Sequence, residues 1–255
     1  MLLAIDIGNT NIHLGLWQNQ TQAWRLSWRA RTVADKMPDE YGVLVRNFLS
    51  SAGVEMDHVK GIVIGSVVPR LTVVFKEISQ RYFQLMPIIV NATINLGIRI
   101  EIDNPQEAGA DRLINAAAVK ALYDHDAIVL DFGTATTFDV VRNGAYQGGA
   151  IAPGINLAHD ALVKNAARLY KIDLEAPPSA IGKNTVHAMQ SGIFWGYVGL
   201  LEGITARIKN ELDEDIKVIG TGGLAPLFNN YTNIIDFIAP ELTLDGLRVI
   251  YELNL

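Results

Sequence analysis

"LLAIDIGNT", residues 2–10, is an apolar run that ends in an aspartate, one spacer residue, a glycine and small polar residues. A strand that only fills a core has no need of a carboxylate and a glycine turn at its end. Because glycine has no Cβ, the backbone N–H groups beside it can approach an anion closely. We therefore interpret this stretch as a strand that brings Asp6 and exposed amides to a polyphosphate.

The same pattern occurs again in "AIVLDFGTA", residues 127–135. Each copy is followed by a second strand-like segment, "IHLGLW" after the first and "TFDVV" after the second. Such a repeat predicts two duplicated lobes that face each other across a nucleotide cleft. We place their boundary shortly before the helix expected at Asp111, which gives lobes of residues 1–105 and 106–255.

Apolar and β-branched runs predict the strands, and apolar residues at helical spacing predict two helices. The expected helices cover residues 111–126 and 188–212. The expected strands cover residues 2–7, 12–17, 61–68, 87–90, 127–131, 137–141 and 217–219. This mixture predicts an α/β fold whose first strands form hairpins.

Composition excludes several classes of protein. The 255 residues are 49% hydrophobic and 19% charged, which is typical of a globular protein with one large core or two smaller ones. The sequence contains no apolar run of membrane-spanning length, and Asp6 argues against a secretory signal. A net charge of −6 argues against a nucleic-acid partner. The absence of cysteine excludes disulfides and thiolate chemistry, and fits a cytoplasmic protein.

Asp6 and Asp131 end the apolar runs of the two copies. Carboxylates repel phosphates, so this placement implies an intervening cation, either magnesium or potassium. Two ordinary aspartates at strand ends are the alternative, and the repeat favours the functional interpretation. Nearby hydroxyl groups are expected to donate to phosphate oxygens: Thr10, Thr134, Thr136 and Thr137.

"GADRLIN", residues 109–115, opens the first predicted helix with Asp111 and Arg112. A helix N-terminus favours anions. Asp111 is either a plain N-cap or a base that accepts the proton of an acceptor hydroxyl. In the second case, Arg112 would hold the acceptor's carboxylate or the transferring phosphoryl group.

The second predicted helix carries glycines on roughly one face, at Gly192, Gly196, Gly199 and Gly203. Each glycine weakens a helix by ~1 kcal/mol relative to alanine. Close packing of another helix, from this chain or from a second copy, is expected to offset that cost.

Several motifs, in this order, resemble the type III pantothenate kinase family: "DIGNT", "GADR", "DFGTATT", "GGAIAPG", "GKNT", "SGIFWG" and "GTGG". They run from residue 6 to residue 223. The resemblance implies the actin-like ATPase fold, with two ribonuclease-H-like lobes. It also implies ATP-dependent phosphorylation of pantothenate to 4′-phosphopantothenate, the first step of coenzyme A synthesis. Magnesium with ATP and a monovalent cation, potassium or ammonium, are the implied cofactors.

The resemblance assigns roles to residues by their position in these motifs. Asp111 is the implied catalytic base, and Asp131 the implied potassium ligand. The implied ATP contacts are Asp6, Gly8, Asn9, Thr10, His13, Gly133 and Thr134. The implied pantothenate contacts are Gly109, Ala110, Asp111, Arg112 and Thr185.

The same resemblance implies a homodimer in which the partner chain helps to close the pantothenate pocket, and the glycine face suits such packing. The chain departs from the family pattern at two positions. Many members have lysine where this chain has His13, so we expect a weaker or pH-dependent phosphate contact. Many have tyrosine where this chain has Ile102, so one pantothenate hydrogen bond is expected to be missing or supplied elsewhere.

Two other functions compete with the kinase. One is an ATPase whose lobes close on nucleotide to signal, and the other is a non-enzymatic transcriptional accessory regulator. The "GADR" motif argues against both, because a chain that transfers nothing has no use for a base there. We expect ATP and pantothenate as partners, and neither nucleic acid nor a membrane.

Overall fold

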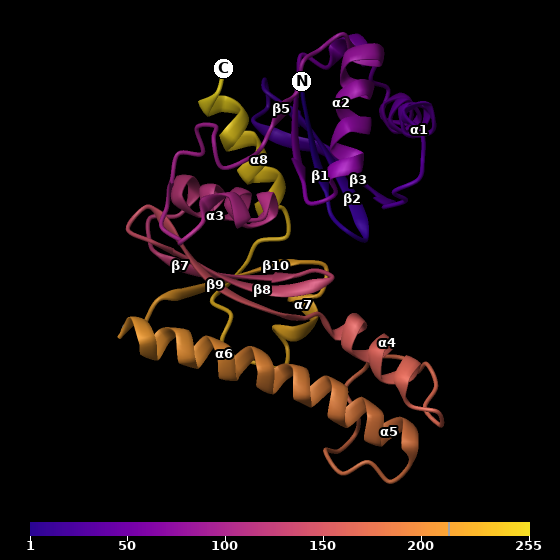
Figure 1. The fold of residues 1–255 in the computed structure, drawn as a ribbon, viewed down its shortest axis with the longest axis vertical. Coiled ribbons are helices and arrows are strands. Elements are labelled where there is room, and N and C mark those ends of the chain that lie inside the picture. Colours follow the sequence, from indigo (N-terminus) through magenta and orange to yellow (C-terminus); the bar gives the residue numbers. More distant parts are fainter. Residues whose placement is uncertain (214) are drawn as a thin grey trace. The chain divides into compact units, whose positions relative to one another are not determined.

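The computed structural model describes residues 1–213 and 215–255, which form a mixed α/β structure with two sheets (Figure 1). Contacts divide the chain into two compact units. The first contains residues 1–125, 142–147 and 241–255, and the second contains residues 126–141 and 148–240. This division differs from the expected boundary after residue 105, which stays a prediction. Both chain ends belong to the first unit.

The sheet of the first unit has the strand order β3-β2-β1-β4-β5. β1 (Leu2–Ile7), β2 (Asn11–Gln18) and β3 (Ala23–Arg31) are antiparallel neighbours. β4 (Gly61–Ser66) runs parallel to β1, and β5 (Ile88–Ile89) runs parallel to β4. The hairpin expected at the start of the chain is therefore confirmed.

Helices cover this sheet. α1 (Pro38–Ser51) and α2 (Pro69–Phe83) pack on each other and fill the core with apolar side chains such as Tyr41 and Phe75 (Figure 1). Both begin with proline, whose missing N–H is not needed in the first helical turn. α8 (Leu242–Leu253) packs on β1, β4 and α3 (Ala110–Leu122). The first unit also holds the 3₁₀ turns η1 (Met56–His58) and η2 (Pro105–Glu107).

The second sheet has the order β11-β10-β7-β8-β9-β6. β7 (Ala127–Phe132) is antiparallel to β8 (Ala135–Arg142) and parallel to β10 (Lys217–Gly222). β9 (Ala145–Pro153) and β11 (Phe237–Ile238) complete the set, and β6 (Arg99–Ile100) pairs with the start of β9. Without β6, the strands β7 to β11 repeat the order of β1 to β5. The repeat in the sequence is thus confirmed as a repeat of strand order.

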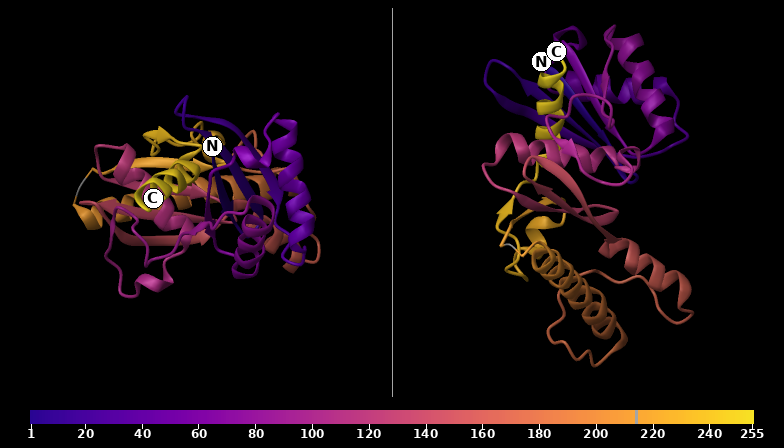
Figure 2. Two further views of the ribbon diagram at one scale, coloured as in Figure 1. Left: turned by 90° about the horizontal axis from the view of Figure 1, so that it is seen from above. Right: turned by 60° about the vertical axis from the view of Figure 1, so that its left-hand side comes forward.

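One helical run covers a face of the second sheet. It consists of α5 (Thr185–Gln190), a π-helical segment η3 (Ser191–Trp195) and α6 (Gly196–Leu212). The sequence predicted one uninterrupted helix here, and the π segment is the correction. Tyr197 and Leu201 pack with Phe132 of β7 and with Phe228 of α7 (Ala225–Phe228). α4 (Ile155–Asn165) packs against the π segment. In the right-hand view of Figure 2, α4 and the longer helical run are the two helices at the lower end of the ribbon.

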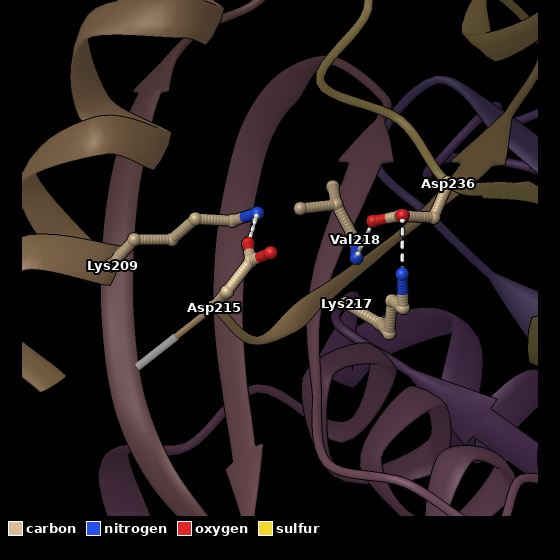
Figure 3. Close-up of polar contacts among 5 residues, drawn as sticks. All are labelled: Lys209, Asp215, Lys217, Val218 and Asp236. Atoms are coloured by element: carbon tan, nitrogen blue, oxygen red, sulfur yellow. Dashed lines mark hydrogen bonds and ion pairs between the residues drawn. The ribbon is translucent and has the colours of Figure 1, made fainter. Parts of the chain in front are cut away.

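Ionic contacts fix the start of β10, the strand that leads into the "GTGG" motif. Asp236 accepts hydrogen bonds from the Val218 N–H at 2.8 Å and from the Lys217 ammonium at 3.0 Å (Figure 3). Lys209, near the end of α6, donates to Asp215 at 2.8 Å. These contacts set where β10 enters the sheet, and hence where its glycine turn lies.

Within residues 1–213 and 215–255, no helix is both long and apolar enough to cross a membrane.

Candidate active site

A tight turn follows β1 in the first unit. Asp6 is the fifth residue of this strand and is partly buried, and residues 8–10 connect it to β2. The Gly8 N–H donates to the Asn11 carbonyl at 3.0 Å, and the Thr32 hydroxyl donates to the Gly8 carbonyl at 2.7 Å. Asn9 and Thr10 are exposed. The turn is therefore held by its own hydrogen bonds and displays polar groups to a ligand.

The second unit repeats this arrangement with a shorter turn. Asp131 is the fifth residue of β7, and the exposed Gly133 and Thr134 connect it to β8. The Gly154 N–H donates to the Thr134 carbonyl at 3.1 Å. A Cβ on Gly154 would lie only 2.5 Å from that carbonyl oxygen. Only glycine permits this approach, so the last residue of the "GGAIAPG" motif supports the turn.

The side chains around Asp131 suit a hard cation. Thr137 is the direct neighbour of Asp131 on β8. The Thr137 hydroxyl donates to Asp139 Oδ2 at 2.6 Å, which uses its one proton and leaves its lone pairs to face a cation or a donor. Carboxylate and hydroxyl oxygens are ligands that potassium and magnesium accept. Across the described ranges no three His, Asp or Glu side chains gather as a metal site.

Thr136 does not act as the sequence predicted. Its side chain is fully buried, and its hydroxyl lies 2.5 Å from the phenol oxygen of Tyr197. It is directly opposite Phe132, on the face of the sheet that α6 covers. The prediction that Thr136 donates to phosphate is therefore wrong, because its hydroxyl is buried and hydrogen-bonded to the Tyr197 hydroxyl.

Asp111 is the second residue of α3, because the helix begins at Ala110 with Gly109 as its N-cap. The alternative that Asp111 is the cap is therefore wrong. Its Oδ1 accepts a hydrogen bond from the Arg112 N–H at 2.9 Å. A Cβ on Gly109 would lie 2.5 Å from the same oxygen, so glycine makes room for the carboxylate.

Burial raises the pKa of the Asp111 carboxyl, while the Arg112 amide and guanidinium act in the opposite direction. A raised pKa makes a carboxylate a better proton acceptor. The Arg112 guanidinium lies 5.4 Å from the centre of the Tyr146 ring, a cation–π contact that holds the side chain in place. The two residues thus form a half-buried acid and a fixed cation at a helix N-terminus.

His13 lies on β2 directly opposite Asp6. Burial, with a smaller effect of the Arg29 charge, lowers the pKa of His13 to about 4, so the ring is neutral at pH 7. Its Nε2 lies 3.8 Å from Glu241 Oε2, and neither buried atom has a hydrogen-bond partner. A neutral ring is in line with the expectation of a weaker or pH-dependent phosphate contact at this position, and the contact of His13 with ATP stays a prediction.

Thr185 opens α5, with the Asn184 side chain as its N-cap. Thr185 is exposed at the edge of a cavity of about 680 Å³ in the second unit. The walls are mainly apolar, with one lysine. They include Leu162, Leu169, Lys183, Met189 and Ile193. Such a cavity suits a ligand with an aliphatic body and an anionic end.

The predicted site residues fall into two groups. The first unit holds Asp6, Gly8, Asn9, Thr10, His13, Gly109, Ala110, Asp111 and Arg112. The second unit holds Asp131, Gly133, Thr134 and Thr185. The sequence did not single out Gly154, Tyr197 or Glu241, since their roles depend on contacts with residues distant in the chain.

Comparison with known proteins gives one consistent family. A family model described as type III pantothenate kinase matches residues 2–207. A type III pantothenate kinase from Roseiflexus sp. is 48% identical over 257 residues, covering 100% of this chain and 99% of the relative. A second, from Dehalococcoides mccartyi, is 44% identical over 254 residues, covering 99% of this chain and 98% of the relative.

Solved structures with a similar fold are more distant in sequence. A Campylobacter jejuni protein provisionally assigned to the Baf family of transcriptional activators has a TM-score of 0.60 at 20% identity, covering 98% of this chain and 97% of the other. The ethanolamine utilization protein EutJ from Carboxydothermus hydrogenoformans has a TM-score of 0.55 at 13% identity, covering 98% and 88%. These likenesses concern the fold alone, and they confirm the predicted actin-like α/β class.

Proposed function

The chain belongs to the type III pantothenate kinase family, and from this premise we propose how its residues phosphorylate pantothenate. The reaction transfers the γ-phosphoryl group of ATP to the hydroxyl of pantothenate and yields ADP and 4′-phosphopantothenate. The protein takes almost no covalent part in such a transfer, so catalysis depends mainly on positioning the substrates and stabilising charge. Each group of residues described above has a part in that positioning.

Asp111 is the proposed catalytic base. The observation that carries this role is a half-buried carboxylate of raised pKa beside the guanidinium of Arg112. The carboxylate orients the pantothenate hydroxyl and accepts its proton late in the transfer. The Arg112 guanidinium holds the substrate carboxylate or the transferring phosphoryl group.

The two strand–turn–strand copies are the proposed ATP site. Gly8, Asn9 and Thr10 of the first unit, and Gly133 and Thr134 of the second, offer backbone amides and hydroxyls to the phosphates. Asp6 and Asp131 act through cations rather than by direct contact. His13 contributes an uncharged ring, in place of the lysine common in the family.

Magnesium is the proposed partner of the ATP phosphates, and potassium or ammonium the proposed partner of Asp131. A monovalent cation there would offset the repulsion between the carboxylate and the phosphates. Thr137, whose lone pairs are left unused by its bond to Asp139, supports this assignment.

Residues 109–112 and Thr185 are the proposed pantothenate contacts. The apolar cavity beside Thr185 suits the aliphatic part of pantothenate, and Lys183 on its wall suits the carboxylate. Ile102 is half-buried and has no polar side-chain atom, so it offers no hydrogen bond to the substrate.

A homodimer is also proposed, in the cytoplasm. Gly192, Gly196 and Gly199 lie exposed on the helical run. Apart from the neighbouring residues and backbone of the run itself, no heavy atom of the described chain comes within 4 Å of a Cβ built on any of them. Another helix of the same protomer therefore does not account for these glycines. A second copy packed on this face would.

One assay tests the function. ADP release is followed with ATP and magnesium, with and without pantothenate, in potassium and in sodium at equal ionic strength. The proposal predicts release that depends on pantothenate, and mass spectrometry should find 4′-phosphopantothenate in proportion to ADP. ADP release that is independent of pantothenate would instead favour an ATPase that signals by closing. No turnover, with nucleotide still bound, would favour a non-enzymatic regulator.

A further inference from the structure

We propose that Tyr197 is a positioning residue that holds the turn of residues 133 and 134 in its nucleotide-binding shape, acting through Thr136. The inference rests on the proposed role of this turn in binding ATP. All the groups involved belong to the second unit.

The contact between Tyr197 and Thr136 is short and buried. The phenol oxygen of Tyr197 lies 2.5 Å from Thr136 Oγ1, and both side chains are buried. Thr136 is the second residue of β8 and pairs with Phe132, the last residue of β7. The bond therefore fixes the residue pair that closes the turn, two residues away from Thr134.

The burial of Tyr197 also keeps its phenol protonated. Burial raises the pKa of Tyr197 to about 12, although the hydrogen bond with Thr136 acts in the opposite direction. The phenol therefore keeps its proton throughout the physiological range, and the bond to Thr136 persists.

A second contact holds the same turn from another element. Gly154, the N-cap of α4, donates its N–H to the Thr134 carbonyl at 3.1 Å. The turn is thus held at Thr134 by the start of α4 and at Thr136 by α6. An exposed turn of two residues keeps one conformation more readily when both of its sides are fixed.

The π-helical segment gives a reason why Tyr197 points to the strands. Ser191–Trp195 lies immediately before Gly196 and Tyr197. A π turn accommodates an extra residue in the helix, and each residue turns the direction of a side chain by about 100°. The segment therefore lets Met189 and Ile193 line the cavity near Thr185 while Tyr197 packs against β7 and β8. One helical run thereby carries both the proposed substrate contact and the support of the proposed nucleotide turn.

The competing interpretation is that Tyr197 only fills the core. Its ring centre lies 4.7 Å from that of Phe228 and 6.3 Å from that of Phe132. A phenylalanine would keep these ring contacts and lose only the hydroxyl. Tyr197→Phe therefore separates the two interpretations.

The test compares Tyr197→Phe with wild type by calorimetric titration of a non-hydrolysable ATP analogue. Loss of one hydrogen bond to the turn should weaken analogue binding by about three- to tenfold. KM for ATP should rise by the same factor, while KM for pantothenate should change less than about twofold. The matched control is Tyr231→Phe, because the Tyr231 ring packs at 4.8 Å from Phe194 in the same aromatic cluster. The control should bind the analogue like wild type.

Action through Thr136 has its own signature. Thr136→Val removes the other half of the contact, and the double variant with Tyr197→Phe should bind the analogue no more weakly than the worse single variant. Hydrogen exchange of the amides of residues 133–136, without nucleotide, should be faster in Tyr197→Phe than in the control. This exchange does not depend on whether the turn binds ATP.

Unchanged analogue binding in Tyr197→Phe, with or without a lower Tm, would overturn the proposal and leave Tyr197 a core residue. Additive effects of the two substitutions would overturn action through Thr136. If the wild-type protein itself fails to bind the analogue, the proposed function fails, and the exchange rates then show separately whether Tyr197 holds the turn.

Discussion

Asp6 and Asp131 occupy the same position in two copies of one strand arrangement. Each is the fifth residue of its strand, and each faces a residue of the neighbouring antiparallel strand, His13 in one copy and Thr137 in the other. Both of those partners approach a second carboxylate. His13 Nε2 lies 3.8 Å from Glu241, and the Thr137 hydroxyl lies 2.6 Å from Asp139.

The two copies have therefore diverged in what they offer a ligand. Beside Asp131, a hydroxyl oxygen with free lone pairs can join a carboxylate around a cation. Beside Asp6, a buried neutral ring takes that place. This difference favours Asp131 as the site of the monovalent cation.

Replacing potassium by sodium at constant ionic strength should cut the kinase activity sharply, because the smaller ion fits a potassium site poorly. Initial rates in the two salts check this. Asp131→Asn removes one negative ligand and should erase most of the difference between the salts. Equal rates of the wild-type enzyme in both salts would remove the assignment of a potassium site.

His13→Gln should reduce the amount by which the free energy of unfolding falls between neutral pH and weak acid. The pKa of His13 is about 4 in the folded chain and 6.5 ordinarily, so between these values the unfolded chain binds more protons. Stability is therefore lost as the pH falls from 6.5 towards 4. At 1.36 kcal/mol for each pH unit, the full loss is roughly 3 kcal/mol.

The measurement is urea unfolding of both proteins at pH 7 and at pH 4.5. The wild type should lose more free energy of unfolding between these pH values than His13→Gln does. Other buried carboxyls, such as Asp245, titrate in both proteins alike and cancel in the comparison. If both proteins lose the same free energy of unfolding, protonation of His13 does not destabilise the folded chain, and the prediction is wrong.

Gly154→Ala should weaken ATP binding by about tenfold. The new Cβ would lie 2.5 Å and 2.7 Å from the carbonyl oxygens of Thr134 and Gly133, which are backbone atoms and move only with the turn. Overpacking of this kind costs about 1–3 kcal/mol. Titration with an ATP analogue measures the loss in affinity.

The matched control is Gly203→Ala in α6, where an added Cβ meets only the flexible end of Arg207, at 3.3 Å. It should leave ATP binding unchanged and stabilise the helix by up to about 1 kcal/mol. If both alanine variants bind the analogue like wild type, the turn tolerates displacement and Gly154 has no role in the site.

Much of this fold was predictable because its signal is local. The run that ends in Asp6 and the run that ends in Asp131 are contiguous apolar strands with a glycine turn, and the structure has both. The matching strand order of the two sheets followed from that repeat. α1 and α2 were not predicted, although both are helices of more than three turns, because neither carries one of the sequence motifs on which the prediction was based.

The details of the site depend on contacts between distant residues. Tyr197 fits the helical spacing of a core residue, and its hydroxyl gains a role only from Thr136, 61 residues earlier. The neutral state of His13 arises from burial and from Arg29 on the next strand. The sequence left open whether Asp111 is an N-cap or a base, and in the structure Gly109 takes the cap position, so that the helix begins at Ala110.

Gly196→Leu should weaken the homodimer and leave the protomer folded. Apart from its neighbours and the backbone of its own helix, nothing in the described chain lies within 4 Å of a Cβ at this position, so a leucine there would point to solvent or to a second copy. Light scattering over a range of concentrations measures the dissociation, and Gly196→Ala should have a smaller effect. A wild-type protein that is monomeric and fully active would overturn the proposed homodimer and the expectation that a partner chain closes the pantothenate pocket.

Asp111→Asn should lower kcat by about 10²- to 10⁴-fold, the usual effect of removing a general base. The amide keeps the shape and can still accept from the Arg112 N–H, so α3 should start as before. The affinity for an ATP analogue should change little, because the nucleotide is assigned to the two turns. Burial raises the pKa of the Asp111 carboxyl, so the acid limb of kcat/KM should lie above the usual range for aspartate.

That acid limb belongs to the base and should disappear from the residual activity of Asp111→Asn. The comparison needs kcat and kcat/KM against pH for both proteins, with the analogue Kd measured beside them. A kcat within a few-fold of wild type would reduce Asp111 to a residue that stabilises the helix N-terminus. If kcat and ATP affinity collapse together, the carboxylate supports the structure of the first unit. A loss confined to kcat, with its acid limb gone, assigns the proton transfer to Asp111.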